Sequence, residues 1–385
     1  MRLMALMLSL LMLSGCSWMK FWESDEDKAL APAELVDFEP EVRIRKQWST
    51  GAGDGQDPLY ANLVPAMLGN TIYAADDEGR VYAVDTSNGK VRWKQDLDRQ
   101  LSGGVGVGGN LVLVGDLRGA LYALDASSGN LLWRKKVKGE ILSAPSANDN
   151  LVVVQTLDSR LLALNPANGE TLWQYNTDVP TLTLRGVSSP ILTSSVVIAG
   201  FANGKIVALE PGNGALLWEK RVALPKGRTE LERIVDVDGS PLLVGDVVYA
   251  TSYQGRAAAM SRGTGRELWF QDISSYQPPA HGLDQVFIST DKDAVTALRA
   301  NSGQVLWTND KLRYRRITSP AYAGGYVAVG DLDGYLHLLS PVDGRFVGRI
   351  KVDGSGLSAP FLVDGSTLYV QANDGSLVAY RFESR

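Results

Sequence analysis

The sequence is poor in the residues that build cross-links and metal sites. Among 385 residues there is one cysteine, Cys16, and there are two histidines, His281 and His337. A single cysteine excludes a disulfide within the chain, and two histidines far apart in sequence do not suggest a metal cluster. The CxxCH motif of c-type haem attachment is also missing. We therefore expect no metal and no cofactor, and we expect His337, in the strand-like stretch LHLL, to lie at an outward or edge position.

Runs of positive charge and short enzyme motifs are missing as well. The net charge is −5 and lysine and arginine form no run, so the electrostatic footprint of a nucleic-acid-binding protein is absent. The sequence contains no GxSxG, Walker loop or HExxH. The acidic stretch 236–239, DVDG, lacks the third acidic ligand and the closing glutamate of a calcium loop. A second stretch, 331–334, DLDG, falls where a turn is expected. We therefore expect a protein that is not an enzyme.

The N-terminus has an apolar run, 3–13, that is too short to span a bilayer as a helix. It follows a basic start, which is typical of a secretory signal peptide, here residues 1–15. The run ends in Leu13-Ser14-Gly15-Cys16, which resembles a bacterial lipobox, in which the cysteine is acylated and becomes the mature N-terminus. An ordinary signal peptide with an incidental cysteine is the alternative. We expect lipidation of Cys16, and Ser17 points, by resemblance to lipoprotein sorting rules, to the outer membrane.

The composition changes after the cysteine. Aromatic residues are followed by the acidic run 23–27 and then by alanine and proline. We interpret residues 16–40 as a flexible tether between the lipid anchor and a folded domain.

Glycine is abundant, with 40 residues, and much of it belongs to an internal repeat. Seven copies resemble GALYALDASSGNLLW, and an eighth begins near the C-terminus. The copies start 38 to 51 residues apart, at Gly79, Gly119, Ser159, Gly204, Gly255, Asp293, Gly334 and Gly375. Periods near 40 residues with several short strands are typical of β-propeller blades.

Each copy is consistent with four strands joined by tight turns. In the second copy we expect strands at 101–107, 111–115, 120–125 and 130–137. The side chains of Asp85, Asp125 and Asn165 directly precede the last turn, where they can accept hydrogen bonds from its backbone amides.

Tryptophan occupies the same slot in six copies, at Trp93, Trp133, Trp173, Trp218, Trp269 and Trp307. The seventh copy has Gly348 there, and the eighth ends before the slot is reached. The N-terminal stretch VRIRKQW ends at Trp48, 45 residues before Trp93, and can supply the missing outer strand. The sequence thus predicts an all-β fold: one eight-bladed β-propeller of four-stranded antiparallel blades over residues 41–385, closed by the N-terminal strand. The repeated indoles are interpreted as packing between blades.

Two connections between blades are longer than their counterparts. Proline marks the inner strands at Pro145, Pro190 and Pro241, and its distance from the preceding tryptophan grows from 12 to 17 and then to 23 residues. The surplus residues fall between an outer strand and the next inner strand, so both insertions lie on one face of the disc. Loops on a rigid scaffold often carry function.

The first insertion contains TLTLRG, with Leu182, Leu184 and Arg185, and the second contains Asp236 and Asp238. The alternation in TLTLRG favours a half-buried strand. Apolar residues beside arginine favour a protein-binding patch. Alternatively, the leucines pack the base of a longer loop and Arg185 pairs internally with Asp236 or Asp238.

The repeat resembles the tryptophan-docking motif of quinoprotein dehydrogenases, which are eight-bladed propellers. That resemblance implies, as the alternative function, a periplasmic quinone-dependent dehydrogenase. The adjacent cysteine pair of many such enzymes is impossible here.

The chain resembles the BamB family of outer-membrane protein assembly factors over essentially its whole length. The resemblance rests on the combination of the lipobox, the tether, the propeller repeat, TLTLRG and DVDG. This resemblance implies a non-catalytic lipoprotein scaffold of the β-barrel assembly machine, lipid-anchored at the periplasmic face of the outer membrane. It implies docking to the POTRA domains of the barrel protein BamA through Leu182, Leu184, Arg185, Asp236 and Asp238. Unfolded barrel precursors are a further expected partner, captured at strand edges by β-augmentation.

Overall fold

The computed structural model describes residues 31–56, 61–224, 228–229, 231–232 and 234–384. Their regular secondary structure consists of β-strands alone, as the sequence predicts. In this part of the chain no helix is long and apolar enough to cross a membrane. The expected signal peptide and Cys16 lie outside the described residues.

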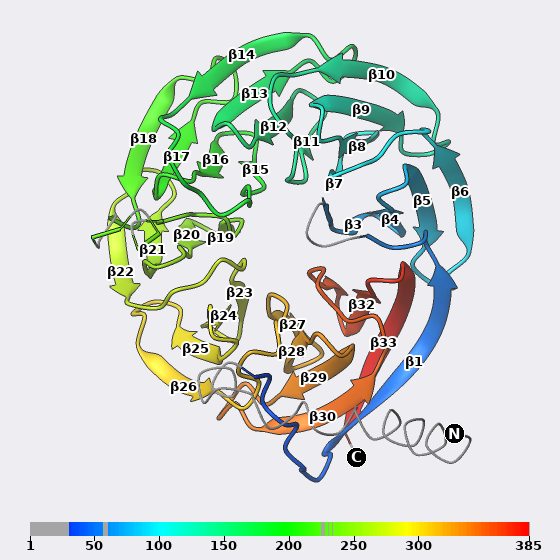
Figure 1. Ribbon diagram of the computed structural model, residues 1–385, viewed down its shortest axis with the longest axis vertical. Coiled ribbons are helices and arrows are strands. Elements are labelled where there is room, and N and C mark those ends of the chain that lie inside the picture. Colours follow the sequence, from blue (N-terminus) through cyan, green and yellow to red (C-terminus); the bar gives the residue numbers. More distant parts are fainter. Residues whose placement is uncertain (1–30, 57–60, 225–227, 230, 233, 385) are drawn as a thin grey trace, which may run out of the picture.

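The strands form a ring of eight antiparallel blades around a central axis (Figure 1). The first four blades, each given from its inner to its outer strand, are β3 (Ala66–Leu68), β4 (Thr71–Ala75), β5 (Arg80–Asp85) and β6 (Val91–Asp96); β7 (Gly103–Gly108), β8 (Leu111–Gly115), β9 (Ala120–Asp125) and β10 (Leu131–Lys136); β11 (Ser146–Ala147), β12 (Val152–Thr156), β13 (Arg160–Leu164) and β14 (Thr171–Asn176); and β15 (Ile191–Leu192), β16 (Val197–Gly200), β17 (Lys205–Leu209) and β18 (Leu216–Arg221).

The last four blades are β19 (Leu242–Val244), β20 (Val247–Ala250), β21 (Ala257–Ser261) and β22 (Glu267–Gln271); β23 (Ala280–Gly282), β24 (Gln285–Ser289), β25 (Val295–Arg299) and β26 (Val305–Asn309); β27 (Ala321–Ala323), β28 (Tyr326–Gly330), β29 (Tyr335–Leu339) and β30 (Phe346–Lys351); and β31 (Leu362–Asp364), β32 (Thr367–Gln371), β33 (Ser376–Ser384) and β1 (Val42–Gly51). The strands predicted for the second blade match β7 to β10 within two residues.

The ring is closed by pairing the two ends of the chain. Strand β1 is antiparallel to β33, in a register that runs from Val42 opposite Ser384 to Gly51 opposite Ser376. The N-terminal strand therefore completes the eighth blade, which confirms the predicted closure. Closure by an outer strand removes the free edge that β33 would otherwise present.

Seven tryptophans join neighbouring blades. The indole N–H donates to a backbone carbonyl of the next blade over 2.7–2.9 Å, from Trp48 to Thr86, Trp93 to Ala126, Trp133 to Pro166, Trp173 to Pro211, Trp218 to Arg262, Trp269 to Ala300 and Trp307 to Pro341. Each ring also covers a turn glycine of that blade. At Gly169 a Cβ atom would lie 2.7 Å from the Trp133 ring, and φ is +71°, so only glycine suits the turn. The packing role of the repeated indole is confirmed.

The joint between blades seven and eight has no tryptophan. Gly348 occupies the slot, and Ile44 of β1 takes up the space beside it, since a Cβ on Gly348 would lie 3.4 Å from Ile44 Cδ1. The closing strand thus fills the joint that the repeat leaves open.

One short strand was not predicted. Between β1 and β3 the chain turns towards the ring centre, and β2 (Asn62–Leu63) pairs in parallel with β7. The side chain of Gln56 fixes it, donating to Leu63 O over 2.9 Å and accepting from Leu63 N over 2.7 Å.

Candidate protein-docking site

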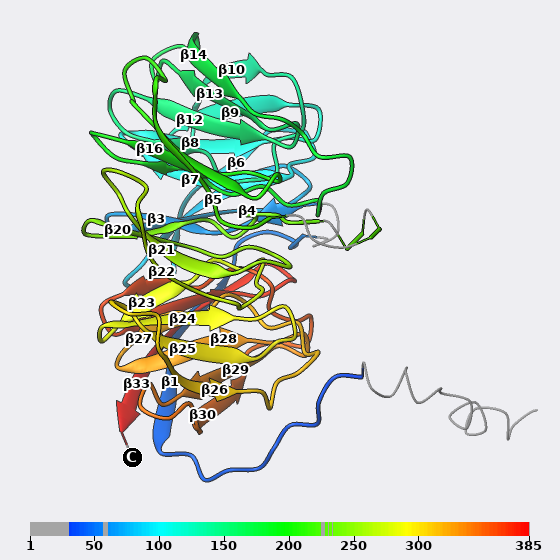
Figure 2. The ribbon, with the colours of Figure 1, turned by 90° about the vertical axis from the view of Figure 1, so that its left-hand side faces the viewer.

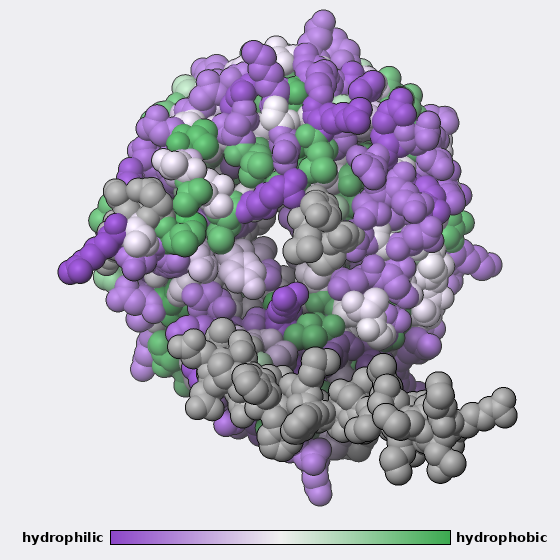
Figure 3. Space-filling view, in the orientation of Figure 1, coloured by the Kyte–Doolittle hydropathy of each residue, from purple (hydrophilic) through white to green (hydrophobic). Residues whose placement is uncertain are grey.

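The two long connections run from β14 to β15 and from β18 to β19. All connections from an outer strand to the next inner strand lie on one face of the disc, which we call the docking face; it is the face shown in Figure 1 and in Figure 3. The two connections are neighbours there because they enter blades four and five.

The segment TLTLRG is not a strand, contrary to the expectation from its alternation. It has no regular secondary structure, and the inner strand of blade four begins only at Ile191. Leu182 is 42% exposed, Leu184 is half-buried and Arg185 is exposed. Its conformation is held by contacts other than strand pairing.

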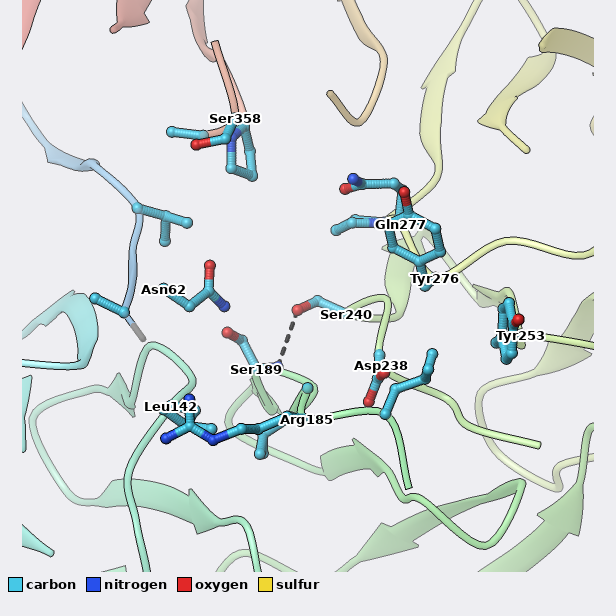
Figure 4. Close-up of a pocket in the computed structure, with 18 of the residues that line it drawn as sticks. Asn62, Leu142, Arg185, Ser189, Asp238, Ser240, Tyr253, Tyr276, Gln277 and Ser358 are labelled. Carbon is cyan, nitrogen blue, oxygen red and sulfur yellow. Dashed lines mark hydrogen bonds between the residues drawn. The ribbon is translucent and has the colours of Figure 1, made fainter. Parts of the chain in front are cut away.

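Those contacts come from the second insertion. The backbone N–H of Leu184 donates to Asp236 Oδ2 over 3.1 Å. Gly186 lies directly against Asp238, because a Cβ atom there would come within 2.5 Å of Asp238 Cγ. Further along, the Ser189 N–H donates to Ser240 Oγ over 2.9 Å (Figure 4). The structure therefore brings the two predicted segments, LTLRG and DVDG, together as one unit, which we call the docking unit.

The two aspartates differ from ordinary surface carboxylates. The Asp236 side chain is 0% exposed and Asp238 is half-buried. Burial raises the pKa of Asp236 to about 7, and burial together with the charge of Asp236 raises the pKa of Asp238. Asp236 Oδ1 is buried without a hydrogen-bond donor among the described residues, which adds to the free-energy cost of ionising this carboxyl. The pair holds the loop from beneath, and Asp236 does not reach the surface.

Arg185 forms an ion pair with Glu140. Its Nη2 atom lies 2.9 Å from Glu140 Oε2, and both side chains are about two-fifths exposed. Glu140 belongs to the connection between blades two and three, so the arginine reaches across a blade boundary. Glu140 is thus an internal partner of Arg185 that was not expected from the sequence. No feature of the sequence near Glu140 indicated this partner.

The site borders a cavity of about 670 Å³ at the centre of the docking face, which is visibly hollowed there (Figure 3). Leu184, Arg185 and Asp238 line this cavity, together with Tyr253 and Tyr276. Figure 4 shows Arg185, Asp238 and the two tyrosines around it. The docking unit thus combines exposed apolar surface, a cation and a hollow beside it, which are features of protein interfaces.

The structure also corrects the expected position of His337. It is 0% exposed, whereas the sequence suggested an outward or edge position. Its Nε2 atom lies 3.0 Å from Asp331 Oδ2, and its Nδ1 atom accepts from Arg349 Nε over 3.1 Å. Asp331 does cap its turn as predicted, since Oδ1 accepts from the backbone N–H groups of Asp333 and Tyr335. Asp331 Oδ1 thus caps the turn as predicted, whereas the bond from Oδ2 to His337 was not predicted.

Within the described residues, no group of three or more His, Cys, Asp or Glu side chains lies close enough together to hold a metal ion.

The fold and this unit define an eight-bladed, tryptophan-linked β-propeller that carries a loop-built candidate docking edge. A family model described as outer membrane protein assembly factor BamB matches residues 44–100, 77–309 and 295–384. A Pseudomonas aeruginosa protein of that description is 53% identical over 376 residues, which cover 98% of this chain and 97% of that protein. The chain belongs to the BamB family.

Solved structures agree with this assignment. The crystal structure of BamB from Moraxella catarrhalis superposes with a TM-score of 0.81 at 30% identity, covering 88% of this chain and 100% of that one. A quinohemoprotein alcohol dehydrogenase from Pseudomonas putida superposes with a TM-score of 0.67 at 14% identity, covering 88% of this chain and 76% of that one. The second likeness shows the propeller fold alone.

Proposed function

We propose that this chain is a non-catalytic scaffold subunit of the β-barrel assembly machine, anchored by lipid on Cys16 at the periplasmic face of the outer membrane. In this role it binds the POTRA domains of BamA and assists the assembly and insertion of outer-membrane β-barrel proteins. Membership of a family of outer membrane protein assembly factors supports the general role. The observation that supports docking most strongly is the LTLRG loop held by the DVDG connection.

The parts of the docking unit have different roles in this proposal. Leu182 and Arg185 are exposed and meet the partner directly, while half-buried Leu184 lines the edge of the hollow. Asp236 and Asp238 act as positioning residues, because they hold the loop by the Leu184 N–H and by the close approach of Gly186. Replacing either aspartate therefore weakens docking through the loop.

The dehydrogenase alternative has less support. Its evidence is the shared propeller and the tryptophan slot, and the likeness to such an enzyme is limited to the fold at 14% identity. Capture of unfolded barrel precursors at outer strand edges remains part of the proposal, because each blade ends in an outer strand at the rim.

Co-purification tests the proposed docking. Leu184→Ala combined with Arg185→Ala is expected to abolish co-purification with BamA, while the variant remains folded and membrane-bound. The matched control is Leu172→Ala, an outer-strand leucine that is 52% exposed and lies away from the unit. Undiminished co-purification of the double variant would remove these residues from the interface.

A further inference from the structure

The segment before β1, residues 31–41, has no strand partner but is held against blade seven. It crosses the rim of the disc from one face to the other (Figure 2). We call residues 33–41 the strap. Its contacts involve backbone, apolar and ionic groups, and they begin at Ala33.

Ala33 is bound through both of its backbone polar groups. Its N–H donates to Arg313 O over 2.9 Å, and its carbonyl accepts from Arg315 Nη1 over 2.9 Å. Both arginines lie in the connection from β26 to β27, which belongs to the docking face.

The middle of the strap is held by Arg349 and by aromatic packing. Arg349 Nη1 donates to Val36 O over 3.0 Å, and its guanidinium carbon lies 4.9 Å from the centre of the Phe38 ring. The Phe38 and Phe346 rings are 5.7 Å apart. Leu35 and Phe38 both pack against the buried cluster between blades six and seven, so the strap adds to the core.

The end of the strap is fixed at the opposite face. Glu41 N–H donates to Val347 O over 2.9 Å, and its carboxylate receives two bonds from Arg345, of 3.0 and 2.8 Å. Val347 is at the start of β30, next to the turn from β29, and such turns lie on the face opposite the docking face.

Two of the arginines that hold the strap, Arg315 and Arg349, are themselves positioned by the buried network around His337. Arg315 Nε lies 2.8 Å from Asp331 Oδ2, and the same oxygen accepts from His337, whose other nitrogen accepts from Arg349. Burial lowers the pKa of His337 and favours the neutral ring, with its proton on Nε2. Only a neutral histidine can accept a hydrogen bond from Arg349 through Nδ1. Arg315 and Arg349 are therefore connected through the buried side chains of Asp331 and His337.

We propose that the strap makes the anchored N-terminus leave the propeller from the docking face, and so turns that face towards the membrane surface. This inference rests on the proposed lipidation of Cys16. Without the strap the chain would leave at Val42, on the opposite face.

The strap also limits how far the disc can stand from the membrane. An extended chain spans at most about 3.6 Å per residue, so the residues from Cys16 to Ala33 cover no more than roughly 60 Å. If the strap were released, the chain from Cys16 to Val42 would cover up to roughly 90 Å. The strap therefore sets both the exit side and the reach.

The attachment of the strap to blade seven can be measured first, in a chain without the lipid. In a Cys16→Ser background, spin labels at Glu34→Cys and Val342→Cys report the distance across the rim; both positions are exposed. We expect a narrow distance distribution that becomes broad when Leu35→Ala and Phe38→Ala are added, and that stays narrow with the control Glu39→Ala. A broad distribution in the parent chain would overturn the strap. A narrow one in the double variant would show that its apolar contacts do not hold it.

Orientation is measured with the full lipidated chain on phosphatidylethanolamine–phosphatidylglycerol vesicles that carry a headgroup quencher. A fluorophore is placed on the docking face at Lys311→Cys or on the opposite face at Val342→Cys. We expect stronger quenching at 311 in the parent chain, and loss or reversal of this difference with Leu35→Ala and Phe38→Ala. Equal quenching in the parent, or an unchanged difference after the strap is released, would refute the orienting role. Vesicle binding by a Cys16→Ser chain would instead refute the lipid anchor.

Discussion

At the residue scale, the Asp236–Asp238 pair is the most unusual feature of the docking unit. An ordinary aspartate has a pKa near 3.9, whereas burial raises the pKa of Asp236 to about 7. A carboxyl whose pKa is raised on folding binds its proton more tightly in the folded state. Its contribution to stability is therefore complete below the unfolded pKa and is lost as the pH rises through the folded value.

This sign gives a pH prediction for Asp236→Asn. In the parent chain, each pH unit between about 4 and 7 should lower the free energy of unfolding by up to about 1.4 kcal/mol through this pair. Asparagine cannot ionise and keeps an oxygen for the Leu184 N–H, so the variant should gain stability relative to the parent as the pH rises. Urea unfolding at pH 5 and pH 8 measures the difference. An identical pH dependence in the two proteins would contradict the raised pKa of Asp236.

The roles of some single residues could be predicted from the sequence, and the roles of others could not. The turn roles of Asp85 and Asp125 were predictable because the carboxylate acceptor and the backbone amides lie within three residues of each other. Both side chains accept hydrogen bonds from the amides of their turns. The pKa of each carboxyl is lowered to about 2, mainly by hydrogen bonds from Ser87 and Ser127. His337 was misjudged because its burial depends on Arg349 and on Asp331, which lie on other parts of the blade. The ion pair between Arg185 and Glu140 was not predicted, because Glu140 comes from a different blade boundary.

At the element scale, strands and loops differed in how well they could be predicted. Blade strands follow a local pattern of alternation and glycine turns, and the repeat presents that pattern several times. The LTLRG loop has the same alternation, yet its conformation depends on a bond to Asp236, 52 residues away. Periodicity alone could not distinguish the two cases, because the deciding contact is long-range.

The loop therefore yields a steric prediction at Gly186. Gly186→Ala places a methyl group 2.5 Å from Asp238 Cγ, so the loop must move away from the second insertion. We expect binding to the POTRA domains to fall by about tenfold, which corresponds to about 1.4 kcal/mol, with little change in thermal unfolding. The matched control is Gly263→Ala, where a Cβ meets nothing within 4 Å. Parent-like affinity of Gly186→Ala would show that docking tolerates a displaced loop.

At the scale of the whole molecule, the ring is held by its closing strand and its tryptophan joints. Trp48 of β1 bonds to Thr86 O of blade one and packs 5.7 Å from the Tyr369 ring of blade eight. It therefore links the last blade to the first. The sequence predicted this closure because the tryptophan spacing continued backwards from Trp93 into the N-terminal strand.

Trp48→Ala should consequently weaken the entire ring. We expect the free energy of unfolding in urea to fall by about 3 kcal/mol, as large-to-small replacements of aromatic residues do. The exposed outer-strand control, Leu172→Ala, should remain within about 0.5 kcal/mol of the parent. A loss no larger than that of the control would contradict closure through β1.

The central claim is that the loop held by Asp236 and Asp238 is the docking edge. The most direct test is calorimetric titration of the soluble propeller with the purified POTRA domains of BamA. We predict that the Leu184→Ala, Arg185→Ala double variant loses at least about 2 kcal/mol of binding free energy, as truncated interface hot spots do, while Leu172→Ala binds like the parent. Equal affinities for the parent and the double variant would contradict the account.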